Sequence, residues 1–278
     1  MKKTLLLPIA IIVYVILTAF FPATDKKVLP TYGNTYAVIV GIADYKYEST
    51  APDLTWTIND ADKFSGFLMS EKGGSIPAGN IYLLKNSKAK KANIIYYAKQ
   101  LFAKAGENDR VIFFFSGHGT EGALVPHDGV YNPSTQQTYN LLYYTELQDI
   151  MKSAKCKTKM IFADACHSGS IKEKEFKKVE DKTEPKPPVR APQDLEVAIM
   201  TASSATELSI EMPELKMGLF SYHLIDGLEG SADANKDKRV TIFELHNYVY
   251  NQVHAKNPKQ SPVTFGKFDK EMVVSSIK

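Results

Sequence analysis

The sequence contains very little cysteine, and this scarcity limits the class of protein that it can encode. Only Cys156 and Cys166 occur among 278 residues, too few for the disulfide framework that stabilises small secreted domains. One disulfide between them is conceivable in an oxidising compartment. However, Cys156 lies in a predicted turn before a strand and Cys166 at the tip after that strand, so a free catalytic thiol is the better interpretation.

The sequence also lacks a strong excess of charge of either sign. The formal net charge is +3 and the pI is about 8.5, and the lysines are spread along the chain instead of forming one basic stripe. Proteins that bind nucleic acid usually carry such a stripe, so no nucleic acid is expected as a partner. With 44% hydrophobic and 23% charged residues, the composition is that of a globular protein.

The first residues differ from the rest of the chain. Lys2 and Lys3 precede a nearly continuous apolar run over residues 5–21, which approaches the length of a bilayer span and is apolar on every side. It has no clear small-residue cleavage site, and no cysteine follows it, which excludes a lipoprotein anchor. We therefore expect residues 1–23 to be either an uncleaved membrane anchor or a cleaved signal peptide, followed by a linker over residues 24–34. The remaining chain is then membrane-anchored or secreted and lies outside the cytoplasm, in the periplasm or the extracellular space.

After the linker, short apolar runs alternate with amphipathic stretches. The apolar runs predict buried strands over residues 36–43, 81–84, 111–115, 159–163 and 196–202. Apolar residues at helical spacing predict helices from residue 57, over 93–104, around 147–151, near 219–228 and over 242–253. Such an alternation implies a mostly parallel sheet with helices on both faces. Residues 35–278 are thus predicted to form one α/β domain.

One segment interrupts this alternation. Residues 172–192 consist largely of Lys, Glu and Pro and offer little apolar surface to bury. Burial there cannot offset the entropy lost on ordering the chain, so the segment is predicted to be a flexible, exposed loop.

Two reactive residues directly follow predicted strands. His118 stands between two glycines after strand 111–115, and Cys166 follows strand 159–163. Because ligands bind at the carboxyl ends of parallel strands, we expect the thiol and the imidazole to lie at one edge of the sheet. A thiolate is a nucleophile, and a neighbouring imidazole makes it available at neutral pH. The backbone amides of Gly119 and Cys166 could form an oxyanion hole beside them.

The segments SGHG (residues 116–119) and DACHSG (residues 164–169) resemble the paired signatures of the caspase-like cysteine peptidases. Cys166 follows His118 by 48 residues, close to the separation of about 50 in caspases. The form DACHSG is similar to that of metacaspases and their bacterial relatives. The resemblance extends over residues 36–253 and implies a caspase-like three-layer sandwich with a six-stranded sheet. It also implies a Cys-His dyad that needs no cofactor and cleaves proteins or peptides after arginine or lysine.

The resemblance assigns a substrate pocket as well. The pocket of metacaspases is acidic, and its residues correspond here to Asp60, Asp164 and Ser116. The chain departs from the pattern at Thr57, where relatives often have cysteine, a change that should affect the shape of the pocket more than its charge. Two carboxylates would bind a guanidinium or ammonium group and repel an aspartate side chain. Alternatively, Asp164 caps the loop after its strand, and Asp60 is a carboxylate favoured at a helix start.

Residues 233–244 follow the spacing of an EF-hand calcium loop. Oxygen-bearing side chains stand at the ligand positions of this motif: Asp233, Asn235, Asp237, Thr241 and Glu244. Lys238 replaces the glycine that the motif requires at its sharp turn, which costs strain and places a cation near the site. Ca²⁺ is therefore a possible ligand, and a purely structural turn is the alternative.

Taken together, these features favour a cysteine endopeptidase with Cys166 as nucleophile and His118 as acid and base. The loop over residues 172–192 occupies the place where relatives carry the segment cut during activation, so self-cleavage there is one hypothesis and a solvated linker is the other. An alternative function is that of a membrane-tethered, non-proteolytic sensor or scaffold with the same fold. The presence of both dyad residues argues against this alternative. A calcium-regulated binding module is a third, and it depends on residues 233–244.

Overall fold

The computed structural model describes most of the predicted domain. The described residues are 33–47, 51–120, 122–132, 134, 137–165, 197–204, 207, 209–266 and 268–277. Contacts divide the chain into a compact unit, Tyr32–Lys278, and an N-terminal unit, Met1–Thr31. The expected anchor or signal (residues 1–23) and the expected flexible loop (residues 172–192) lie outside the described residues. Within the described ranges, no helix combines the length and the apolar character needed to cross a bilayer.

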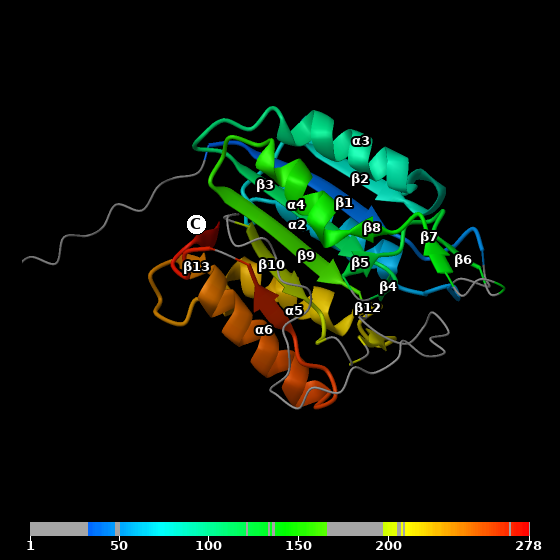
Figure 1. Cartoon of the computed structure of the whole chain (residues 1–278). Coiled ribbons are helices and arrows are strands. Elements are labelled where there is room, and N and C mark those ends of the chain that lie inside the picture. The colour runs from blue at the N-terminus through cyan, green and yellow to red at the C-terminus, as the bar shows by residue number, and fades with distance from the viewer. Residues whose placement is uncertain are drawn as a thin grey trace, which may run out of the picture. The chain divides into compact units, whose positions relative to one another are not determined.

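A six-stranded sheet forms the centre of the compact unit (Figure 1). Its order is β14 (Val263–Phe265), β10 (Val197–Thr201), β9 (Thr158–Asp164), β3 (Arg110–Ser116), β1 (Thr35–Gly41) and β2 (Ile81–Lys85). Neighbouring strands are parallel except for β10 and β14. The mostly parallel, six-stranded sheet is confirmed, and the five strands predicted from apolar runs agree with β1, β2, β3, β9 and β10. The three residues of β14 were not predicted as a strand, because so short a segment has no recognisable periodicity.

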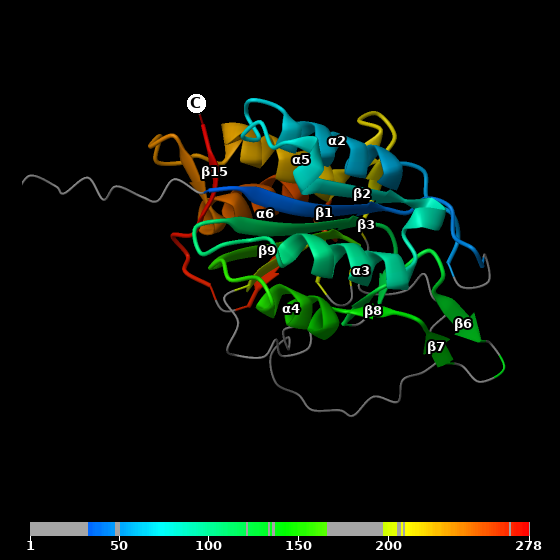
Figure 2. The same cartoon turned by 90° about the horizontal axis from the view of Figure 1, so that it is seen from above.

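Helices cover both faces of the sheet (Figure 2). On one face lie α3 (Lys91–Phe102) and α4 (Tyr144–Lys152), and on the other α2 (Thr57–Met69), α5 (Leu219–Asp226) and α6 (Ile242–Lys256). Successive strand residues point to opposite faces: Phe113 packs in the α3–α4 core, and its neighbour Phe114 packs in the other. There, Phe64 of α2 stacks on Phe114 with ring centroids 4.4 Å apart. The three-layer sandwich is thus confirmed, and burial on both faces explains why the strands are apolar throughout.

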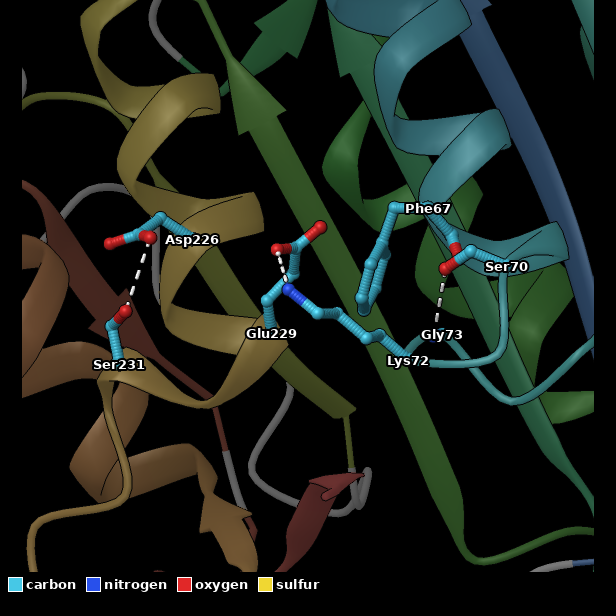
Figure 3. A network of polar contacts seen from close by, with 7 residues as sticks. All are labelled: Phe67, Ser70, Lys72, Gly73, Asp226, Glu229 and Ser231. Atoms are coloured by element: carbon cyan, nitrogen blue, oxygen red, sulfur yellow. Dashed lines mark hydrogen bonds and ion pairs between the residues drawn. The ribbon is translucent and has the colours of Figure 1, made fainter. Parts of the chain in front are cut away.

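An ion pair joins the segment after α2 to the π-helical turn η3 (Gly227–Ser231), which follows α5, and hydrogen bonds within each segment flank it (Figure 3). Lys72 Nζ lies 2.8 Å from Glu229 Oε2. Ser231 Oγ donates to Asp226 Oδ1 at 3.1 Å, and Ser70 Oγ accepts from the backbone amide of Gly73. Because the Lys72 side chain is 65% exposed, this ion pair stabilises the fold little. The apolar core between the helices therefore fixes their arrangement, and with it the position of their first turns.

Several short strands lie outside the main sheet and were not predicted from the sequence. β4 (Gly119–Thr120), β5 (Ala123–Leu124) and β8 (Leu142–Tyr143) form one small sheet, and β6 (Val130–Asn132) pairs with β7 (Gln137–Tyr139). β11 (Glu211–Met212) pairs with β12 (Met217–Gly218), and β13 (Arg239–Thr241) with β15 (Val273–Ser276). Two of these elements matter for the site, since β4 directly follows His118 and the β11–β12 hairpin leads into α5.

Candidate active site

The carboxyl ends of β3 and β9 bring the two predicted motifs together. Ser116 and Asp164 are paired in the parallel register, and the backbone amide of Gly117 donates to the carbonyl oxygen of Asp164 at 3.1 Å. His118 and Cys166 therefore stand two positions beyond paired residues of adjacent strands. Cys166 itself lies outside the described residues, so its catalytic role stays a prediction.

Backbone contacts fix the imidazole of His118 and determine which ring nitrogen carries its hydrogen. Nε2 lies 2.7 Å from the carbonyl oxygen of Pro52. A carbonyl can only accept, so Nε2 donates and Nδ1 is left for proton transfer. The backbone amide of His118 donates to Tyr45 Oη at 2.7 Å. Burial lowers the pKa of His118 below its ordinary value, opposed by the bond to Pro52, so the ring is neutral at physiological pH and suited to act as a base.

Glu211 holds the segment that carries Pro52. Its carboxylate, on β11, accepts from the backbone amides of Trp56 at 2.6 Å and Thr55 at 3.1 Å. The negative charge of Glu211 also acts to raise the pKa of His118, as a smaller effect than burial. The β11–β12 hairpin thus positions the loop against the histidine.

A cavity of about 210 Å³ opens beside the histidine. It is lined by residues from the strand ends, the start of α2 and the β11–β12 hairpin: Leu54, Thr57, Asp60, Ser116, Gly117, His118, Asp164, Ala165, Ser209, Ile210, Glu211 and Gly218. Ala165 is the last described residue before Cys166. The cavity therefore extends from His118 to the residue that precedes the predicted nucleophile in the sequence.

Asp60, in the first turn of α2, is one of two buried carboxylates in the cavity. Ser116 Oγ donates to its Oδ2 at 2.7 Å, and the backbone amide of Gly218 donates to its Oδ1 at 2.9 Å. A Cβ atom on Gly218 would lie 2.2 Å from Asp164 Oδ2 and 3.1 Å from Asp60 Oδ2. The two carboxylates therefore meet at residue 218, and glycine leaves the space that both of them need.

Asp164, at the end of β9, is held by two serines. Ser209 Oγ donates to its Oδ1 at 2.6 Å. Ser221, in the first turn of α5, donates to Oδ2 from its backbone amide at 3.0 Å and from its hydroxyl at 2.7 Å. Gln260, which is fully buried, supports Ser209 through its Nε2 at 3.3 Å. The carboxylate is thus fixed from both sides.

The cavity has the electrostatic character of a cation-binding site. Burial raises the pKa of Asp60 to about 8, and the nearby charge of Asp164 adds to this. Burial likewise raises the pKa of Asp164, opposed by the hydrogen bonds from Ser209 and Ser221. Glu211 also lines the cavity, and among the described lining residues there is no lysine or arginine to balance these carboxylates. A bound guanidinium or ammonium group would supply that balance and favour the charged carboxylates.

The raised pKa of Asp60 predicts that stability falls with rising pH. Between about pH 4 and pH 8 the folded chain holds a proton on this carboxyl that the unfolded chain releases, so the free energy of unfolding decreases as pH rises through this window. Asp60→Asn removes the titration and should be more stable than the wild type at pH 8. We expect the difference between their melting temperatures to grow from pH 6.5 to pH 8.5, and a constant difference would contradict the assignment. Comparing the two proteins cancels the contributions of the buried histidines.

The structure brings together the described residues that were predicted for the pocket: Asp60, Ser116 and Asp164 line one cavity with His118. Gly119 begins β4 directly after the histidine, and its oxyanion role stays a prediction. Sequence reasoning missed a further group that positions these residues, namely Tyr45, Pro52, Ser209, Glu211, Gly218 and Ser221. All except Ser221 belong to loops and short elements without periodicity, and Ser221 lies in the predicted helix α5, where nothing local marks it as a partner of Asp164. The glycine before the α5 helical pattern was the only local signal among them.

Oxygen atoms of the expected calcium loop face backbone amides. Asp233 accepts from the amides of Asp237 and Lys238, Asn235 accepts from Asp237, and Asp237 accepts from Arg239. Glu244 and Thr241 form a capping box at the start of α6. No group of three or more His, Cys, Asp or Glu residues able to hold a metal occurs in the described part of the chain. Calcium binding therefore stays a prediction, and no chemical step is derived through it.

The second cysteine has the surroundings of an unreactive thiol. Cys156 is free and 1% exposed, and its Sγ lies 3.6 Å from the carbonyl oxygen of Thr158. Burial raises the pKa of the Cys156 thiol, which reduces the fraction of reactive thiolate.

Comparisons with known proteins show the family to which the chain is related. The family model of the caspase domain of C14 peptidases matches residues 34–273. A probable protease from a Desulfuromonadales bacterium is 28% identical over 226 residues, 72% of this chain and 26% of that protein. Metacaspase-1 of Lodderomyces elongisporus is 28% identical over 158 residues, 50% of this chain and 34% of that protein. The matched regions thus span about a quarter to a third of these relatives.

Solved structures share the fold at low sequence identity. Caspase-1 from Spodoptera frugiperda superposes with a TM-score of 0.63 at 16% identity, over 90% of this chain and 92% of that chain. A protein from Geobacter sulfurreducens gives a TM-score of 0.58 at 15% identity, over 88% of this chain and all of that one.

Proposed function

The chain belongs to the caspase-domain family of C14 peptidases, and on this premise we propose that it is a cysteine endopeptidase that cleaves after arginine or lysine. Cys166 is the nucleophile and His118 the base. The observation that carries the proposal is the pairing of Ser116 with Asp164, because it directs both motifs to one edge of the sheet, beside an acidic cavity.

In the proposed reaction, Nδ1 of His118 takes the proton of the Cys166 thiol. The thiolate attacks the carbonyl carbon of the scissile bond, and the amides of Gly119 and Cys166 stabilise the resulting oxyanion. When the C–N bond breaks, His118 returns the proton to the leaving amine. Water then hydrolyses the thioester, with His118 again acting as base. The hydrogen bond from Nε2 to Pro52 supports this assignment, since it keeps the ring in one orientation and leaves Nδ1 as the proton acceptor.

The two buried carboxylates support a preference for a basic residue before the scissile bond. Asp60 and Asp164 line the cavity next to His118, and both have pKa values raised chiefly by burial. A cationic side chain would favour the charged form of both carboxylates, whereas an aspartate side chain would add further negative charge.

The proposal is tested with fluorogenic peptides that differ only in the residue before the scissile bond. The purified full-length protein should cleave the Arg and Lys peptides at least about 100-fold faster, in kcat/KM, than the Asp peptide, as expected if two charge-assisted hydrogen bonds are lost. Calcium is varied in parallel. Cleavage after Asp would leave the dyad standing and refute the pocket. No cleavage by folded protein would favour the non-proteolytic, membrane-tethered sensor or scaffold.

We also propose that the peptidase domain lies outside the cytoplasm, anchored or released, because residues 1–23 combine two lysines with an apolar run. Digestion of intact cells, of cells with a permeabilised outer membrane and of lysed cells with an added protease tests this. A domain that is digested only after lysis would contradict the proposal. Self-cleavage within residues 172–192 stays a prediction from the sequence.

A further inference from the structure

One hydroxyl in the acidic cavity has no hydrogen-bond partner among the described residues. Thr57, the first residue of α2, is 4% exposed and lines the cavity together with Asp60 and Asp164. Among the described residues that line the cavity, its Oγ1 is the buried side-chain polar atom left without a partner. A buried hydroxyl without a partner is unfavourable in the free protein. Such a group at a binding site points to a ligand that completes its hydrogen bonding.

The backbone holds Thr57 in place. A Cβ atom on Gly41, at the end of β1, would lie 2.7 Å from the carbonyl oxygen of Thr57, so the first turn of α2 approaches the strand as closely as a glycine allows. The adjacent amides of Thr55 and Trp56 are bound by Glu211. Thr57 therefore cannot move away from the cavity to find another partner without displacing the start of the helix.

The remaining acceptor capacity of the cavity matches arginine better than lysine. A carboxylate has about four lone-pair sites. Asp60 uses two of them for Ser116 and Gly218, and Asp164 uses three for Ser209 and Ser221. About three sites remain on these two carboxylates, and the carboxylate of Glu211 also lines the cavity. The carboxylates alone can therefore take up the three donors of a lysine ammonium group, whereas the five donors of a planar guanidinium group can reach the hydroxyl of Thr57 as well.

We propose that Thr57 is a specificity-determining residue of this cavity: its hydroxyl accepts a hydrogen bond from a bound guanidinium group and so favours arginine over lysine. The inference rests on the proposed function, which supplies the basic substrate. The choice of Thr57 rests on its unpartnered hydroxyl. Lysine binding leaves Oγ1 without a partner, whereas arginine binding gives it one.

Thr57→Val, which replaces the hydroxyl with a methyl group of similar size, separates a ligand-binding role from a structural one. It should lower kcat/KM for the Arg peptide about tenfold, corresponding to the loss of one hydrogen bond to a charged group, and change that for the Lys peptide less than about twofold. Its melting temperature should rise by about 2–4 °C, because an unsatisfied buried hydroxyl is removed. Thr57→Ser, which keeps the hydroxyl, should retain the Arg preference.

Binding measured without catalysis distinguishes a failure of this inference from a failure of the proposed function. In the Cys166→Ala background, agmatine should raise the melting temperature more than cadaverine does, and Thr57→Val should abolish that difference. If the wild type cleaves neither peptide but these shifts are seen, the endopeptidase proposal fails and the role of Thr57 stands. An unchanged Arg-to-Lys ratio in Thr57→Val, or a lower melting temperature with equal loss for both peptides, would overturn the inference.

Discussion

Replacing Cys166 with alanine is expected to lower kcat/KM for an Arg peptide by at least about 10⁴-fold, because the nucleophile of the covalent step is removed. His118→Ala should cause a loss of similar size. Since both residues act in one step, the double variant should lose little more than either single variant. Steady-state kinetics on protein shown to be folded by thermal denaturation provide the measurement.

The matched control for this prediction is the other cysteine. Cys156 is buried in the α3–α4 core and its thiol pKa is raised, so Cys156→Ala should keep kcat/KM within about twofold of the wild-type value. It should lower the free energy of unfolding by about 1 kcal/mol, the usual effect of removing a small buried group. Substantial activity in Cys166→Ala, or its loss in Cys156→Ala, would contradict the assignment of the nucleophile.

Asp164→Asn should have the second-largest effect, lowering kcat/KM for Arg and Lys peptides by about 10²–10³-fold. Removing one partner of a buried ion pair costs about 3–5 kcal/mol, and here the pair forms only when the cationic side chain is bound. The fold should tolerate the change. Asparagine keeps an oxygen for Ser221, and the hydroxyl of Ser209 can rotate to accept from the new amide group.

Asp62→Asn is the matched control for the pocket. Asp62 lies on α2, as Asp60 does, but its carboxylate pairs with Lys85 and is 44% exposed. We expect Asp62→Asn to stay within about twofold of the wild type in kcat/KM, since exposed ion pairs contribute little. Equal losses in Asp62→Asn and Asp164→Asn would indicate a general effect of charge and contradict a specific pocket. A fall in kcat/KM confined to Asp164→Asn supports it.

Most of the fold followed from the sequence because five of the six strands of the main sheet contain a largely apolar run. The run over residues 111–115, for example, became β3 at the centre of the sheet. What could not be predicted are elements of two or three residues whose partners are distant in the sequence. Glu211, on β11, contacts Thr55 across 156 positions, and neither periodicity nor composition marks such a contact.

The candidate site was predictable where a motif directly follows a strand, and less so elsewhere. His118 and Asp164 belong to such motifs, and the structure places both beside one cavity. Ser209 and Ser221 are single serines whose importance arises only because the hairpin and α5 fold back on Asp164. The raised pKa of Asp60 likewise depends on burial by the assembled domain, which no local pattern encodes.

The most direct test of the account is covalent labelling with two peptidyl fluoromethyl ketones, one ending in arginine and one in aspartate, read by mass spectrometry of the digested protein. The reagent reports the nucleophile and the pocket together, because it alkylates a thiolate only after its side chain is bound. We predict a single adduct on Cys166, formed with the arginine reagent and not with the aspartate reagent, and absent in Asp164→Asn at the same concentration. An adduct on Cys156, or labelling by the aspartate reagent at an equal rate, would contradict the account.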